Sequence, residues 1–136
     1  MGTWSYEPLS NDTAADWLET LLAADDLGPI ESALDAVLAA GHEYLDADLA
    51  SEAVAAVEVL ARLAGGGTPH DDDTSELDRW VAAHVRLPDT PLHDKAALAI
   101  DRVLGDASEL RDLWDETEDA DAWRTTLVAL AAALRR

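Results

Sequence analysis

Residues 48–64 constrain the fold more than any other segment, because they are almost entirely apolar and rich in alanine and leucine, the strongest helix formers. After Asp48, the polar residues of this segment are only Ser51, Glu52, Glu58 and Arg62. A helix on the surface of a domain carries one apolar stripe and is polar elsewhere. This segment leaves only a narrow polar strip, so we predict a central helix with neighbours on most of its sides.

The remaining sequence predicts further helices around this one. Apolar residues recur at the spacing of one helical face, as in Ala14, Trp17, Leu18 and Leu21. The expected helices cover about 13–24, 29–41, 48–64, 74–85, 92–104, 107–117 and 121–134. Alternating apolar segments and internal repeats are absent, so we predict an all-α, compact bundle of about seven helices in a single domain, 1–136. We expect 48–64 and 92–104 in its middle.

Several helix ends are marked by capping residues. Asn11, with Asp12 and Thr13, supplies side-chain oxygens that can accept a bond from the first free amides of a helix. Gly41 is typical of a helix C-terminus. Asp106 with Glu109 has the spacing of a capping box before the sixth helix.

Charge limits the choice of partners. The formal net charge is −20, from 29 acidic and 9 basic residues. A phosphate backbone or an anionic membrane surface would be repelled, so we expect neither nucleic acid nor membrane as a partner. A basic protein would be attracted and steered toward the chain. The same acidity is also explained by solubility or by adaptation to a salt-rich cytoplasm.

The sequence gives few signs of chemistry. It contains no cysteine, which fits a reducing compartment, and Met1–Tyr6 do not resemble a secretory signal, so we expect a cytoplasmic location. None of the four histidines (His42, His70, His84 and His93) has a histidine or glutamate three or four positions away, the spacing of a helical metal site. Phosphate-binding loops and nucleophile motifs are also missing. We therefore predict no catalytic residue, no metal and no cofactor. His84 is interpreted as a satisfied core residue.

Two segments resemble a known family. The run Met1-Gly2-Thr3-Trp4, followed by Asn11-Asp12-Thr13-Ala14-Ala15-Asp16, is similar to the opening of domain-of-unknown-function family 4259, a group of uncharacterised small bacterial proteins. The sequence departs from that pattern at Ser5, where a glycine is usual, and at Leu9, where a phenylalanine is usual. The segment 108–116, with Ser-Glu-Leu followed by Leu-Trp, resembles a second element of the family.

The resemblance implies no activity, but it marks seven positions. They are Trp4, Asn11, Asp12, Asp16, Ser108, Glu109 and Trp114. We interpret them as structural: Asn11 and Ser108 cap helices, Asp12 and Asp16 accept amides of the N-terminal segment, and the tryptophans pack. In the other interpretation, Asp12, Asp16 and Glu19 form an acidic helix face that binds a cation or a basic side chain.

Three hypotheses about function stay open at this stage. The first is a non-enzymatic protein–protein interaction module that binds a basic partner, which includes an immunity-type role of neutralising a toxin. The second is a ligand-binding or enzymatic domain with a carboxylate site near Asp12 and Asp16. The third is a structural domain adapted to high salt. The sequence predicts neither the oligomeric state nor the identity of a partner.

Overall fold

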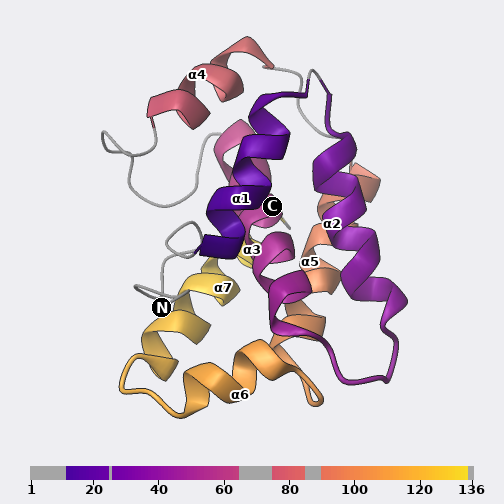
Figure 1. The fold of residues 1–136 in the computed structure, drawn as a ribbon, viewed down its shortest axis with the longest axis vertical. Helices are drawn as coiled ribbons and strands as arrows, with labels where there is room; N and C mark the ends of the chain where they lie inside the picture. The colour runs from indigo at the N-terminus through magenta and orange to yellow at the C-terminus, as the bar shows by residue number, and fades with distance from the viewer. Residues whose placement is uncertain (1–11, 25, 65–74, 85–89, 135–136) are drawn as a thin grey trace.

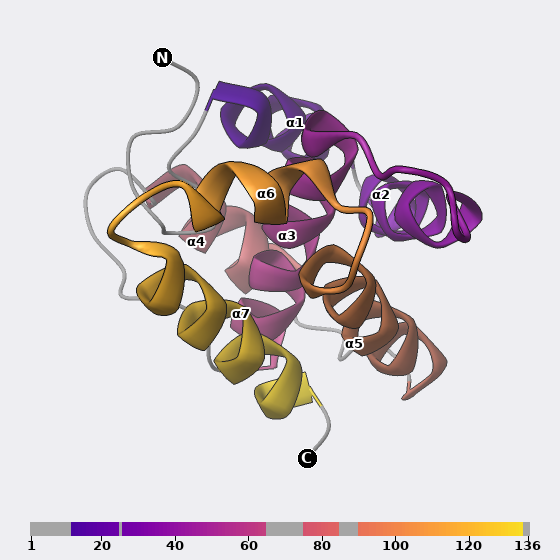
Figure 2. The same ribbon diagram turned by 90° about the horizontal axis from the view of Figure 1, so that it is seen from below.

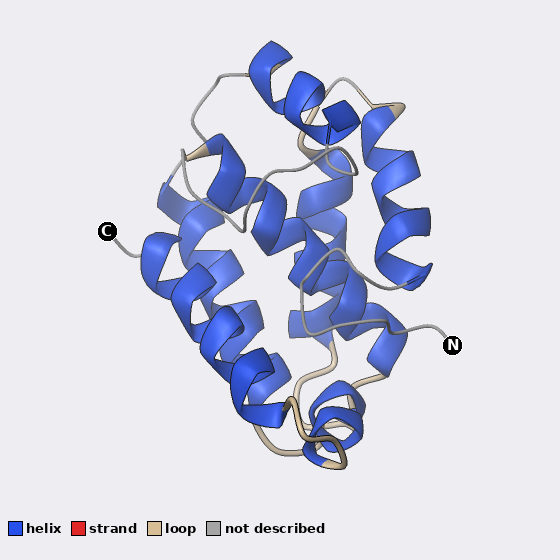
Figure 3. Ribbon diagram, turned by 90° about the vertical axis from the view of Figure 1, so that its left-hand side faces the viewer, coloured by secondary structure: helices blue, strands red, loops and turns tan. Residues whose placement is uncertain are grey.

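The computed structural model describes residues 12–24, 26–64, 75–84 and 90–134. Within these ranges the chain forms α-helices and no named strand, which confirms the all-α class (Figures 1 and 3). The helices are α1 (Asp12–Leu22), α2 (Gly28–Ala39), α3 (Ala47–Leu63), α4 (Ser75–Ala83), α5 (Thr90–Leu104), α6 (Glu109–Asp115) and α7 (Ala120–Leu134). None of them is long and apolar enough to cross a bilayer.

Helix α3 is the centre of the bundle, as its composition predicted. It contacts every other described helix, and Figure 2 shows it between α1, α2, α5, α6 and α7. From Ala50 to Leu63 every residue except Glu52 is buried. Helix α5, which the sequence also placed in the middle, packs on one side of α3 and keeps Leu98 56% exposed. It therefore belongs to the outer layer.

The polar strip of α3 differs from the prediction, because most of it does not face water. The side chains of Glu58 and Arg62 are fully buried, and Ser51 is 7% exposed. Arg62 donates through Nε to Glu58 at 2.5 Å and through Nη1 to Asp78 of α4 at 2.9 Å. A charged group is stable in a core only when other groups satisfy it. The strip thus attaches α4 to the centre of the molecule.

The N-terminus of α3 has all of its first amides satisfied. The Asp46 carboxylate caps the helix by accepting from the amides of Asp48 (2.8 Å) and Leu49 (3.3 Å). The amide of Ala47 donates to Glu109 at 2.8 Å, from a residue 62 positions away in the chain. The Ala50 amide begins the regular helical bonding by donating to the Asp46 carbonyl. These acceptors satisfy the amides that have no partner within the helix, although Asp46, Asp48 and Leu49 are themselves exposed.

Two other helix ends, the C-terminus of α2 and the N-terminus of α6, also have recognisable caps. Gly41 has a φ of +57° directly after the C-cap Ala40, the left-handed position that glycine occupies at low cost. Ser108 caps α6, as expected from the family element, with its hydroxyl accepting from Arg111 at 3.4 Å. The predicted capping box of Asp106 and Glu109 is therefore wrong. Glu109 is the first helical residue, and its carboxylate serves α3 instead of its own helix.

The buried charges of α3 give the first testable prediction. Arg62→Met keeps most of the side-chain volume but removes the guanidinium that Glu58 contacts inside the core. We expect the free energy of unfolding to fall by about 3–5 kcal/mol, because a buried carboxylate then loses its counter-charge. Urea unfolding followed by circular dichroism measures the change.

The matched control is Lys95→Met. Lys95 forms its ion pairs with Glu31 and Asp35 at the surface, where both carboxylates are more than half exposed. Surface pairs contribute roughly 0–1 kcal/mol, so this variant should unfold almost as wild type does. Equal loss in both variants would contradict a special role for the buried pair.

Candidate functional site

An open groove lies where α1, α2 and the first half of α3 meet, and Figure 2 shows these three helices side by side. Its volume is about 660 Å³. The residues that line this acidic groove are Thr13, Asp16, Trp17, Thr20, Pro29, Ser32, Ala33, Ala36, Asp48 and Glu52. The volume suits a side chain or a small organic group, since ligand pockets measure roughly 300–1,000 Å³.

The lining of the acidic groove combines negative charge with an apolar floor. Asp16, Asp48 and Glu52 come from two different helices, and the described residues of the lining include no lysine, arginine or histidine. Trp17 and Ala33 are buried beneath it and supply apolar surface. A long basic side chain needs this combination, because its methylene groups prefer apolar contacts while its charged end prefers carboxylates.

Among the three carboxylates of the groove, Glu52 has a raised pKa. Partial burial raises the pKa of Glu52, and the negative charges of Asp48 and Asp46 raise it further. Both causes act against the ionised form. A cation in the groove would offset the negative charges of Asp48 and Asp46. A positive ligand would therefore stabilise the ionised form of Glu52.

The groove is held in place by contacts at the first turn of α3. Thr13 donates its hydroxyl to Asp48 at 3.1 Å, which joins the start of α1 to the start of α3. Asp48 itself follows the N-cap Asp46, so its backbone position is fixed by the cap. The first turn of α3, which carries Asp48, is therefore held in position at the N-terminal end of the helix.

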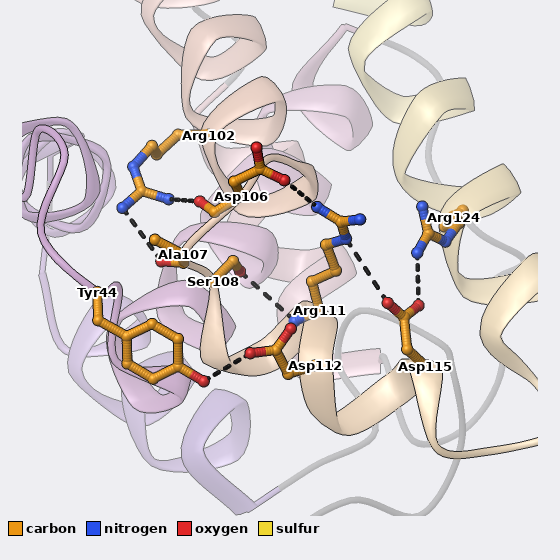
Figure 4. Close-up of polar contacts among 9 residues, drawn as sticks. All are labelled: Tyr44, Arg102, Asp106, Ala107, Ser108, Arg111, Asp112, Asp115 and Arg124. Carbon is orange, nitrogen blue, oxygen red and sulfur yellow. Dashed lines mark hydrogen bonds and ion pairs between the residues drawn. The ribbon is translucent and has the colours of Figure 1, made fainter.

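The connection between α2 and α3, residues 40–46, is fastened by Arg102 of α5. Its guanidinium donates to the carbonyls of Gly41 (2.9 Å) and Glu43 (2.5 Å), and also to those of Asp106 and Ala107 before α6. Figure 4 shows Arg102 beside Asp106 and Ala107. Leu45 adds a parallel bridge to Ser108 by donating its amide to the Ala107 carbonyl and accepting from the Glu109 amide. One arginine thus links two connections that are distant in sequence.

The five family positions that the structure describes fall into two groups around α3. Asp12 and Asp16 are both exposed on α1, but only Asp16 lines the acidic groove. Trp4 and Asn11 lie outside the described residues, so the predicted contacts of the N-terminal segment stay predictions. Ser108 and Glu109 serve helix starts, as described above.

The last family position, Trp114, packs as expected. It is 7% exposed and stacks on Trp123 of α7, with ring centroids 6.1 Å apart. Both family segments reach the first turn of α3, since Thr13 contacts Asp48 and Glu109 contacts Ala47. The family element near residue 108 is therefore part of the scaffold that holds the groove.

Sequence reasoning did not place Asp48 and Glu52 in a site. Their i, i+4 spacing puts both on one face of α3, and this was the available signal. It stayed ambiguous because carboxylates are frequent throughout this chain. Only the packing of α1 and α2 shows which carboxylates share a groove.

None of the described histidines, His42, His84 and His93, lines the groove. His84 is partly buried, stacks on Trp80 at 4.1 Å between centroids and has Nδ1 2.7 Å from the Trp80 carbonyl, in agreement with a satisfied packing role. His42 is exposed, and His70 lies outside the described residues. Within the described part of the chain, no three side chains of histidine or acidic type gather in a way that could hold a metal ion.

Comparison with known proteins places the chain in a family. Searches among curated proteins and among solved structures find no match. A family model described as a domain of unknown function, DUF4259, matches residues 2–126. This match covers most of the 136 residues and agrees with the resemblance of the two sequence segments. The chain is a member of the DUF4259 family.

Proposed function

We propose that this protein is a non-enzymatic interaction module that binds a basic protein partner, with an arginine or lysine side chain of the partner entering the acidic groove. The observation that supports this is the composition of the lining, whose described residues give three carboxylates and an apolar floor and include no basic side chain. The net charge of −20 would speed the encounter with a basic partner.

Within the groove, affinity would come from two sources. Hydrogen bonds between a guanidinium and a carboxylate are shorter and stronger than those between neutral groups. The buried ring of Trp17 offers apolar surface to the methylene groups of the same side chain. Because Asp16 and Glu52 come from different helices, a forked guanidinium suits the site better than a compact ammonium.

A binding role is also favoured over catalysis by the types of residue present. Among its described residues the lining has hydroxyl groups but no histidine, and the sequence has no cysteine; these are the usual bases and nucleophiles of small active sites. An immunity-type role, in which a basic toxin is neutralised, belongs to the proposed class. We place this activity in the cytoplasm, since the cysteine-free sequence fits a reducing compartment.

The groove can be tested with a nona-arginine peptide as the probe. The double variant Asp16→Asn with Glu52→Gln keeps the shape of both side chains and removes their charge. We expect its dissociation constant to rise at least about tenfold, because a charged hydrogen bond contributes roughly 1.5–3 kcal/mol. Isothermal titration calorimetry at about 0.15 M ionic strength, where exposed charges more than about 8 Å apart are largely screened, measures the constant.

The control for this experiment is Glu116→Gln with Glu118→Gln. Both glutamates are exposed and neither lines the groove, so the control loses the same amount of charge elsewhere. It should bind within about twofold of wild type, since exposed charges are screened by salt. Equal weakening in both double variants would show general attraction to an acidic surface and would refute the groove.

The raised pKa of Glu52 predicts the pH dependence of binding. A bound guanidinium stabilises the ionised carboxylate and so lowers the pKa of Glu52 from its raised value in the free protein. Between the two pKa values, binding releases a proton, and the affinity must therefore rise as pH rises through that range. Calorimetry in buffers of different ionisation enthalpy measures the released proton.

Glu52→Gln is the control for the pH experiment, because it removes this titration and leaves Asp16 and Asp48 in place. We expect this variant to lose the rise in affinity that occurs at the highest pH, where the Glu52 carboxyl of the wild-type protein ionises. A variant whose pH profile coincides with that of wild type would mean that the probe does not contact Glu52.

A further inference from the structure

Tyr44 stands out among the apolar side chains of the described surface, because its ring is exposed and at the same time held in position. The residue is 58% exposed, on the connection between α2 and α3. Its hydroxyl donates to Asp112 of α6 at 2.8 Å, as Figure 4 shows. An exposed tyrosine is common, but one tethered at its tip to a distant helix has lost much of its rotational freedom already.

The backbone on both sides of Tyr44 is fastened as well. The Glu43 carbonyl accepts from Arg102, and Leu45 bonds through both its amide and its carbonyl to the segment before α6. Leu45 is also fully buried. Ordering an aromatic side chain at an interface normally costs binding free energy, and here folding has already met that cost.

The surroundings of the ring are acidic. A hydrogen bond to Asp112 raises the pKa of Tyr44, with further contributions from loss of hydration and from the charges of Asp112 and Glu109. Arg111 pairs with Asp106 and Asp115, which balance its charge. Arg102 keeps its positive charge beside the Glu43 carbonyl, but the two carboxylates that act on Tyr44, those of Asp112 and Glu109, outnumber it. A cation is thus the ligand that both the ring face and the carboxylates would attract.

We propose that Tyr44 is a second contact point for the basic partner, where an arginine of the partner lies on the exposed ring with its guanidinium beside Asp112. This inference rests on the proposed function, since it assumes the same basic partner. Asp46 and Asp48 join the two contact points along the chain, because Asp48 lines the acidic groove only four residues after Tyr44. The tyrosine adds an aromatic anchor of the kind that dominates many interfaces.

The nona-arginine peptide can test the anchor in three variants. Tyr44→Ala removes the ring and should weaken binding about three- to tenfold, the range that a cation–π contact supplies. Tyr44→Phe keeps the ring and should bind within about twofold of wild type. Leu113→Ala is the matched control, because Leu113 is 50% exposed beside Asp112 but has no aromatic ring; it should also bind as wild type does.

A direct measurement on the ring guards against a variant that fails to fold. In a Tyr6→Phe background Tyr44 is the single tyrosine, and its ring signals and phenolic pKa are measurable by NMR. Saturation with the peptide should shift the ring signals and lower the pKa of Tyr44, because a guanidinium stays charged in the range where the phenol ionises. Thermal unfolding of each variant shows whether it is folded.

The two proposals fail in different ways. If Tyr44→Ala binds as tightly as wild type and the ring signals do not move, while the Asp16 and Glu52 variant is weakened, the anchor is refuted and the groove stands. If neither variant changes the affinity, both proposals are refuted. A shifted ring together with a weakened Tyr44→Ala variant supports the anchor.

Discussion

The structure depends on how the first turn of α3 is satisfied. Asp46, Asp48 and Leu49 are exposed at this turn, yet protein oxygens satisfy the first amides of α3. Asp46 supplies one carboxylate from the preceding residue, and Glu109 supplies another from α6. The bond between Ala47 and Glu109 holds α6 against the start of α3, and the bridge between Leu45 and Ser108 joins the same two segments.

The packing around α3 also explains why the acidic groove lies beside the N-terminal part of this helix. The C-terminal half of α3 is covered, and its charges are turned inward by Arg62, which joins Glu58 to Asp78 of α4. The first turn of α3 is instead exposed at Asp48 and Leu49, and it is held by contacts such as that of Thr13 with Asp48. Space for a groove is therefore left beside Glu52, the residue of 50–63 that is not buried.

The sequence was sufficient for features that depend on neighbouring residues. The burial of most of 48–64 followed from its composition, and the cap Ser108 was expected from the family element that contains it. Features that join distant segments could not be predicted in this way. A glutamate and an arginine four residues apart are typical of a solvated helix face, and nothing local to Glu58 shows that α4 covers it. Glu109 could equally serve its own helix, and the choice of Ala47 becomes visible only in three dimensions.

The positions of the described basic side chains support the acidic groove as a binding site more strongly than the net charge of the protein does. Arg62, Arg111, Arg124 and Lys95 pair with carboxylates, while Arg79 and Arg102 donate to carbonyls. In the part of the chain that the structure describes, each cation thus has an internal acceptor. None of them lines the groove, although placing one there would relieve the repulsion between Asp48 and Glu52 that raises the pKa of Glu52. Because that repulsion remains in the free protein, a cation from outside gains more free energy in this groove than at an isolated surface carboxylate.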